Sequence, residues 1–239
     1  MNMNLKLILA IIYILCLSIV LFVVFNYLDL RELTNYSYIK ENTNFLLNYK
    51  NNNIFVFSFL FILISIFWVL LLGFGSPIAI ISGFLFGKWI GTIITVFSFT
   101  VGSCLLYILA QYYFRDFIIK HFSKKIERYK NLFHKNELLY FLIFRLSGGA
   151  GIPFAIQNIL PTIFDMKIKN YIISTFFGLI PTLFIICSLG SGVKNLIGES
   201  NSISYKSVFT DPGIYWPLVG FLILLMISLL CKKIFFKKK

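Results

Sequence analysis

Long apolar runs separated by short polar segments make up most of the chain. At a rise of 1.5 Å per residue, about 20 apolar residues cross a hydrocarbon core of roughly 30 Å. Four runs predict simple helical spans: 5–28, 54–74, 170–189 and 214–231. The first is longer than the apolar core of a signal peptide and lacks a small-residue cleavage site. We therefore expect it to be an uncleaved signal anchor.

A further apolar run, 78–114, is too long for one span and contains several glycines. Because glycine and proline break regular helices, we predict a short re-entrant segment (77–86), a turn at Gly87 and Lys88, and a spanning helix (89–114). Broken backbone at membrane depth needs protein or a water-filled cavity to satisfy its N–H and C=O groups. The hinge positions expected in this hairpin are Pro77, Gly83 and Gly87.

The run 138–161 is broken in a similar way. It contains Arg145, then three glycines and a proline within 147–153, and then the amides of Gln157 and Asn158. An arginine inside an apolar run is costly unless it faces a cavity, so this run is not a simple span. A turn follows at 164–167. The hinge positions expected here are Gly149, Gly151 and Pro153.

The two broken runs share one order of features. Each has a proline-broken segment, a tight turn bearing a lysine (Lys88 or Lys167), and then a glycine-containing apolar helix. Interrupted segments at corresponding places in two halves are typical of inverted-repeat transporters, whose binding site lies near the membrane midplane. The sequence therefore predicts an all-α polytopic membrane protein with about five spanning helices and two opposed re-entrant broken hairpins that form an inverted repeat.

The polar segments set the expected boundaries. We expect a signal-anchor helix and polar loop over 1–53, a membrane core over 54–192, and a polar loop, last span and basic tail over 193–239, with the loop already beginning at Gly190. Segment 115–137 carries seven basic and three acidic residues, with apolar residues at helical spacing. It predicts an amphipathic surface helix. Because basic segments tend to stay inside, we expect this helix and the lysine-rich tail on the cytoplasmic face of an inner or plasma membrane.

Composition agrees with a membrane protein, since 59% of residues are hydrophobic and 13% charged, against about a quarter charged in soluble domains. The 22 Lys and Arg exceed the 9 Asp and Glu, and they flank apolar spans. That placement suits anionic lipid and not nucleic acid. The sequence has no Ser-His-Asp set, HExxH or GxxxxGK[ST] motif, so we do not expect an enzyme. Its four cysteines form no CxxC pair and its two histidines stand apart from them, so we expect no metal or other cofactor.

Several short motifs occur in a distinctive order between Phe74 and Gly192. They are 81–91 (ISGFLFGKWIG), Gly102-Ser103 with Tyr107, Phe144-Arg145-Leu146, Ile152-Pro153-Phe154 with Asn158, Gly178-Leu179-Ile180-Pro181, and Gly190. With these motifs the chain resembles the DedA superfamily, and more narrowly its VTT-domain (SNARE-associated, Golgi Tvp-type) branch. The resemblance covers about half of the chain.

This resemblance implies two packed re-entrant hairpins, each followed by a spanning helix. It also implies movement of lipids across the bilayer, by scramblases in eukaryotes and by carriers of undecaprenyl phosphate or other anionic lipids in bacteria. In some members this movement is coupled to proton or sodium gradients. Membrane lipids are therefore the expected partners, and self-association into a homo-oligomer is left open.

The chain departs from the family pattern at three places. An aromatic-x-x-x-Arg pattern is replaced by Tyr107 and Gln111, with Arg115 one turn further on. The usual Arg-x-x-Pro is replaced by Arg145 with a proline at Pro153. The acidic residue that many bacterial members carry in the first hairpin is absent, because 75–88 holds no carboxylate. We therefore do not expect proton coupling by that route.

Arg145 is the main candidate for binding a lipid phosphate, because a guanidinium binds phosphate bidentately. Gln157 and Asn158 either line the same cavity or satisfy backbone groups that Pro153 leaves open. Arg115 is either a headgroup ligand or an interfacial anchor. Tyr107 and Gln111 complete the expected groove, and Gly178 and Pro181 are expected to kink a helix or allow close packing.

The leading hypothesis is thus a polar groove that carries a phosphate headgroup between two hairpins. A secondary transporter of a small ion or solute is the alternative, and a non-transporting assembly factor is the third.

Overall fold

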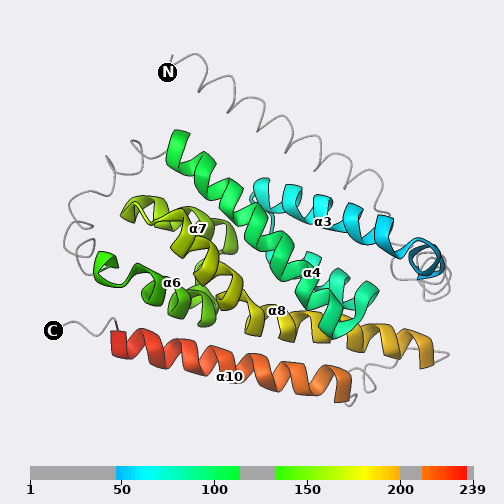
Figure 1. Cartoon of the computed structure of the whole chain (residues 1–239). Helices are drawn as coiled ribbons and strands as arrows, with labels where there is room; N and C mark the ends of the chain where they lie inside the picture. Colours follow the sequence, from blue (N-terminus) through cyan, green and yellow to red (C-terminus); the bar gives the residue numbers. More distant parts are fainter. Residues whose placement is uncertain (1–46, 114–132, 200–211, 236–239) are drawn as a thin grey trace. The chain divides into compact units, whose positions relative to one another are not determined.

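The computed structural model describes residues 47–113, 133–199 and 212–235, and every regular element in these ranges is helical (Figure 1). The elements are α3 (Ile54–Leu70), α4 (Gly75–Tyr113), α6 (Glu137–Leu146), η2 (Gly148–Gly151), α7 (Phe154–Ile159), η3 (Leu160–Phe164), α8 (Ile168–Glu199) and α10 (Pro212–Phe235). The all-α prediction is confirmed for these residues. The chain divides into two compact units, Met1–Phe55 and Val56–Lys239. The predicted signal anchor at 5–28, most of the surface helix and Arg115 lie outside the described residues.

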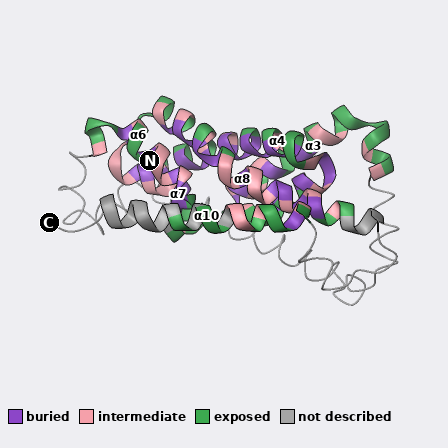
Figure 2. Ribbon diagram, turned by 90° about the horizontal axis from the view of Figure 1, so that it is seen from below, coloured by how far each residue is buried: buried purple, intermediate pink, exposed green. Residues whose placement is uncertain are grey.

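Two described helices are long and apolar enough to cross a membrane, namely α4 and residues Ile168–Asn195 of α8. The second unit exposes large apolar side chains, including Ile93 at 69% and Phe59 at 60%, while it buries Ser103 and Thr175 completely (Figure 2). A lipid solvent tolerates such an apolar exterior, and small hydroxyl residues suit close packing between membrane helices. The chain therefore has the character of a membrane protein. Helix α10 covers the predicted last span at 214–231.

Gly87 interrupts α4, with φ 79° and ψ 172°, backbone angles that residues other than glycine rarely adopt. The residues on its two sides lie against each other, because Ser82 Oγ donates a hydrogen bond to the Gly91 carbonyl at 3.0 Å. The chain therefore reverses between a short helix that ends near Phe86 and a long helix that ends at Tyr113. This confirms the predicted break at Gly87.

The second half repeats this order of elements. Helix α6 ends at Leu146 and is followed by an irregular stretch in which Gly148, Gly149 and Gly151 have φ of 68°, 73° and 79°. Short helices α7 and η3 follow, and Asp165, with φ 51°, separates them from the long helix α8. Both halves thus contain a helix, a break, a short helix, one residue of positive φ and a long helix. The predicted turn at 164–167 is confirmed.

Each short helix packs against the long helix of the other half. In the first half, a Cβ on Gly83 would lie 1.9 Å from the Cys187 carbonyl oxygen of α8. In the second half, Asn158 of α7 accepts a hydrogen bond from Ser103 of α4 at 3.0 Å. We call this exchange the reciprocal packing of the two halves. It brings α4, α7 and α8 together around one interior.

One predicted boundary was wrong. The segment from Gly190 was expected to be a loop, but α8 continues through it to Glu199. The reason is tertiary, since a Cβ on Gly190 would lie 2.0 Å from the Ile80 carbonyl oxygen, so this glycine permits close approach and does not end the helix. Glu137, the last residue of the polar segment 115–137, is the first residue of α6 and is buried.

Candidate functional site

Arg145 lies in the last turn of α6 and is 1% exposed. Its backbone position is fixed against α8, because a Cβ on Gly178 would lie 2.4 Å from the Arg145 Cβ. A side chain at residue 178 would therefore push the two helices apart. The glycine of α8 is what allows the arginine to enter the interior.

The guanidinium is held by three neutral groups. Its Nη1 donates to Gln157 Oε1 at 3.2 Å, and its Nη2 donates to Asn158 Oδ1 at 2.7 Å and to the Tyr171 hydroxyl at 3.2 Å. The Cζ atom also lies 4.9 Å from the centroid of the Phe141 ring. These contacts join α6, α7 and α8 at one point.

No carboxylate forms an ion pair with Arg145 among the described residues. Its Nε and the Asn158 Nδ2 are buried without a hydrogen-bond partner. Burying a charge is costly unless it is paired, and neutral amide oxygens compensate for that cost less than a carboxylate would. Within the described residues, Arg145 is therefore a buried cation that contacts only neutral groups and no anion.

Two tyrosines tie this site to α4. The rings of Tyr107 and Tyr171 stack with centroids 4.6 Å apart, and the Tyr107 hydroxyl donates to the Met166 carbonyl at 2.6 Å. The Tyr171 hydroxyl lies 3.2 Å from the Ser103 carbonyl and 3.3 Å from that of Asn158, and it donates toward them. We use the name Arg145 cluster for Ser103, Tyr107, Arg145, Gln157, Asn158 and Tyr171.

Gln157 also forms hydrogen bonds with the backbone of the glycine-rich break. Its Nε2 donates to the Ile152 carbonyl at 2.6 Å and approaches that of Gly148 at 3.4 Å. A Cβ on Gly149 would lie 2.1 Å from the Gln157 amide, so this side chain needs glycine beneath it. Gln157 thus contacts both the guanidinium and the backbone carbonyls of the glycine-rich break.

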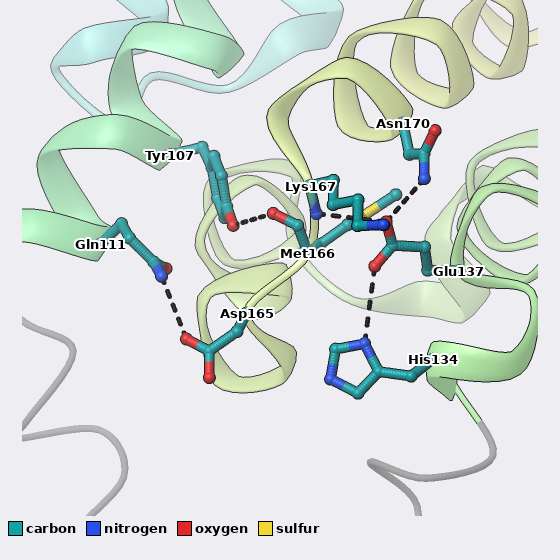
Figure 3. A network of polar contacts seen from close by, with 8 residues as sticks. All are labelled: Tyr107, Gln111, His134, Glu137, Asp165, Met166, Lys167 and Asn170. Carbon is teal, nitrogen blue, oxygen red and sulfur yellow. Dashed lines mark hydrogen bonds and ion pairs between the residues drawn. The ribbon is translucent and has the colours of Figure 1, made fainter.

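A second polar network lies around Glu137, which is 6% exposed (Figure 3). Its Oε1 accepts hydrogen bonds from the Lys167 backbone N–H at 3.2 Å and from Asn170 Nδ2 at 2.6 Å. Its Oε2 lies 3.6 Å from His134 Nδ1. The carboxylate therefore joins the start of α6 to the start of α8.

Replacing this carboxylate is expected to weaken the fold. Glu137→Ala leaves the Lys167 N–H and the Asn170 amide without their acceptor, and we expect a loss of about 2–4 kcal/mol. Glu137→Gln keeps an acceptor oxygen and is expected to lose about half as much. Thermal unfolding of the detergent-solubilised variants measures both, and equal midpoints for Glu137→Ala and the wild type would contradict the network.

The structure brings together some of the predicted site residues and separates others. Gln157 and Asn158 bind Arg145, and Tyr107 is linked to it through Tyr171. Gln111 instead donates to Asp165 Oδ1 at 3.0 Å. Among the hinge residues, Pro77 lies in the first short helix, Pro153 precedes α7, and Gly178 and Pro181 lie inside α8. No group of three or more His, Cys, Asp or Glu that would hold a metal ion occurs in the part of the chain that the structure describes.

Sequence reasoning missed Ser103, Glu137 and Tyr171 as parts of these networks. In the sequence, Ser103 belongs to a family motif and Tyr171 lies within an apolar run that predicts a span. Their contacts reach across 68 positions from Tyr171 to Ser103 and 33 positions from Asn170 to Glu137. The one local signal was the position of Glu137, a charged residue directly before an apolar run. Such a position is also typical of a residue at the membrane interface.

Comparison with known proteins gives a consistent result. Residues 72–192 match the family described as the VTT domain. The chain is 25% identical over 182 residues to Transmembrane protein 41 homolog from Dictyostelium discoideum, covering 74% of this chain and 53% of that protein. It is 24% identical over 134 residues to mouse Transmembrane protein 41B, covering 55% of this chain and 46% of that protein. The chain thus spans about half the length of these relatives. No solved structure gives a significant match.

Proposed function

Because the chain belongs to the VTT domain family, we propose that it moves phospholipids with anionic phosphate headgroups across a bilayer, without covalent chemistry. The two broken helical hairpins would form the sides of a polar groove, and the acyl chains would stay in the hydrocarbon. The broken segments would be re-entrant, and the protein would reside in an inner or plasma membrane with its basic segments in the cytoplasm.

The observation that carries this proposal is the burial of Arg145 with neutral partners. An Arg–carboxylate pair inside the protein would resist exchange, because both charges would be compensated. A guanidinium held by two amide oxygens and a phenol is stabilised when a phosphate replaces them, because the anion adds an attraction between opposite charges and accepts two parallel hydrogen bonds. The resting contacts thus keep the cation in place while leaving it free to accept an anion.

The glycine-rich break offers a way to open this site. Gln157 and Asn158 both lie on α7, and α7 is connected to α6 through η2, which contains three glycines of positive φ. Glycine backbone rotates with little steric restraint. A rotation at this hinge would withdraw both amides together and expose the guanidinium to a headgroup.

Lipid translocation in liposomes tests the proposal. The full chain is reconstituted with a trace of phosphatidylglycerol that carries a fluorophore on its headgroup, and a membrane-impermeant reductant is added outside. Translocation brings inner-leaflet label to the outside, so we expect the fluorescence to fall toward zero, whereas protein-free liposomes retain about the inner half.

If the wild type also stops at the protein-free level, with or without an imposed ion gradient, the proposal is wrong. Uptake of a labelled anionic solute by the same liposomes would then favour the secondary-transporter alternative.

A further inference from the structure

Two neighbouring pockets share one lysine near the start of α8. The first has a volume of about 380 Å³ and the second about 520 Å³, and both are open to the surface. Lys167, in the turn before α8, lines both of them. The lining of the two pockets differs in chemistry, and that difference indicates what they hold.

The first pocket is polar and cationic. Its charged lining consists of Lys135, Lys167, Glu137 and His134, which gives at least one net positive charge with the histidine neutral. Glu137 is engaged by Lys167 N–H, Asn170 and His134, as Figure 3 shows. Within the described ranges, neither lysine amino group has a hydrogen bond or an ion pair. The two ammonium groups are therefore the available charges in this pocket.

The second pocket is mostly apolar. Its walls include Ile108 and Tyr112 from the last turns of α4, Met166 from the turn before α8, and Ile168 at the start of α8. Both helices are long and apolar enough to cross a membrane. Because these ends are the ends of spans, the pocket is expected at the level where hydrocarbon meets headgroups, and Tyr112 is a residue type enriched there.

From this juxtaposition we infer that the paired pockets dock an anionic phospholipid before it is translocated. The phosphate lies in the polar pocket with Lys135 and Lys167 as its cations, and the start of an acyl chain lies in the apolar pocket. This inference rests on the proposed function and deepens it by naming where the substrate enters.

The shared lysine is the reason for a lipid as the occupant instead of free phosphate. A phosphate ion alone would leave the apolar pocket empty, whereas a phospholipid joins an anionic group to a hydrocarbon chain at one covalent junction. Lys167 stands at the matching junction of the two pockets. Tyr107 also lines the apolar pocket and stacks on Tyr171, so the docking site adjoins the Arg145 cluster.

Photo-crosslinking of the full chain in detergent tests this assignment. The probe is a phosphatidylglycerol with a diazirine in its acyl chain, and crosslinked residues are mapped by mass spectrometry. We expect crosslinks at Ile108, Tyr112 or Met166. The double variant Lys135→Gln/Lys167→Gln is expected to crosslink at least about ten-fold less, because two charge-assisted contacts to phosphate are lost.

Lys169→Gln is the matched control. Lys169 is exposed in the first turn of α8, two residues after Lys167, and lines neither pocket, so this variant is expected to crosslink like the wild type. Short-chain phosphatidylglycerol is expected to displace the probe, and inorganic phosphate at the same concentration is not. The assignment is overturned if the double variant keeps wild-type crosslinking, if the crosslinks map elsewhere, or if inorganic phosphate competes as well as the lipid does.

The outcome is separable from that of the proposed function. Crosslinking that depends on the two lysines, together with no translocation by the wild type, would keep the docking site and refute the transport proposal. Translocation by the wild type, together with crosslinking that does not depend on the two lysines, would support the transport proposal and refute the docking site.

Discussion

Arg145→Met is expected to slow translocation of anionic lipid by about a hundred-fold in the liposome assay. The variant removes the guanidinium that the proposed mechanism offers to the phosphate. Two charge-assisted hydrogen bonds at about 1.5 kcal/mol each correspond to about two powers of ten in rate. The initial rate of fluorescence loss, normalised to the amount of reconstituted protein, measures the effect.

The fold should tolerate this substitution. Methionine loses the contacts to Gln157, Asn158 and Tyr171, but it also removes the cost of burying a charge that has no carboxylate partner. Removing Arg145 leaves the Gln157 Oε1 without its donor, which costs about 1–3 kcal/mol, and the loss of the unpaired buried charge offsets part of this cost. We therefore expect an unfolding midpoint slightly below that of the wild type.

Arg145→Lys separates charge from geometry. It keeps the cation but presents a single ammonium group in place of a planar fork, so we expect a rate between those of the wild type and Arg145→Met. A well-folded Arg145→Met protein that moves lipid at the wild-type rate would show that the cation serves structure alone.

Gly83→Ala is expected to destabilise the protein by about 3 kcal/mol or more, which lowers the unfolding midpoint by about 6–12 °C in a chain of this size. The new Cβ would lie 1.9 Å from the Cys187 carbonyl oxygen, which belongs to the backbone of α8 and cannot rotate away. The first short helix must then separate from α8. Thr95 on the following long helix also contacts Cys187, with Oγ1 and Sγ 3.9 Å apart, so a shift of α8 at Cys187 would disturb this contact as well.

Gly220→Ala provides the matched control for this substitution. Gly220 lies inside α10, and its Cβ would meet Ile185 at an ordinary contact distance of 3.4 Å. Alanine is a better helix former than glycine, so this variant is expected to gain about 0.5–1 kcal/mol. Thermal unfolding in detergent compares the two. Similar midpoints for both variants would contradict the close packing of the first short helix on α8.

The breaks in the two halves were predictable from sequence because they are local properties. Gly87 adopts a φ that side chains disfavour, and the glycines between 147 and 153 do the same. Apolar runs likewise predicted the helices that surround these breaks. Arg145, Gln157 and Asn158 were recognisable as a group because they are polar residues close together within one apolar run.

The remaining features depend on contacts between distant segments. Gly190 has the same local signature as a loop glycine, and its contact with the Ile80 carbonyl in another helix decides that it lies inside α8. The partnership of Tyr171 with Arg145 requires α8 to lie beside α6, which no residue pattern within either helix encodes. Similarly, the acidic side chain of Glu137 finds its partners 30 and 33 positions later.

The reciprocal packing also constrains how the protein is made. The first short helix packs on α8 through Gly83, and Thr95 of the following long helix contacts Cys187 across 92 positions. At about 5–20 residues per second, ribosomes need roughly 5–18 seconds to synthesise the intervening chain. During that interval Gly83 lacks the helix that later packs against it. The first half would therefore need an insertase or membrane chaperone to shield its small polar surface for the whole of this interval.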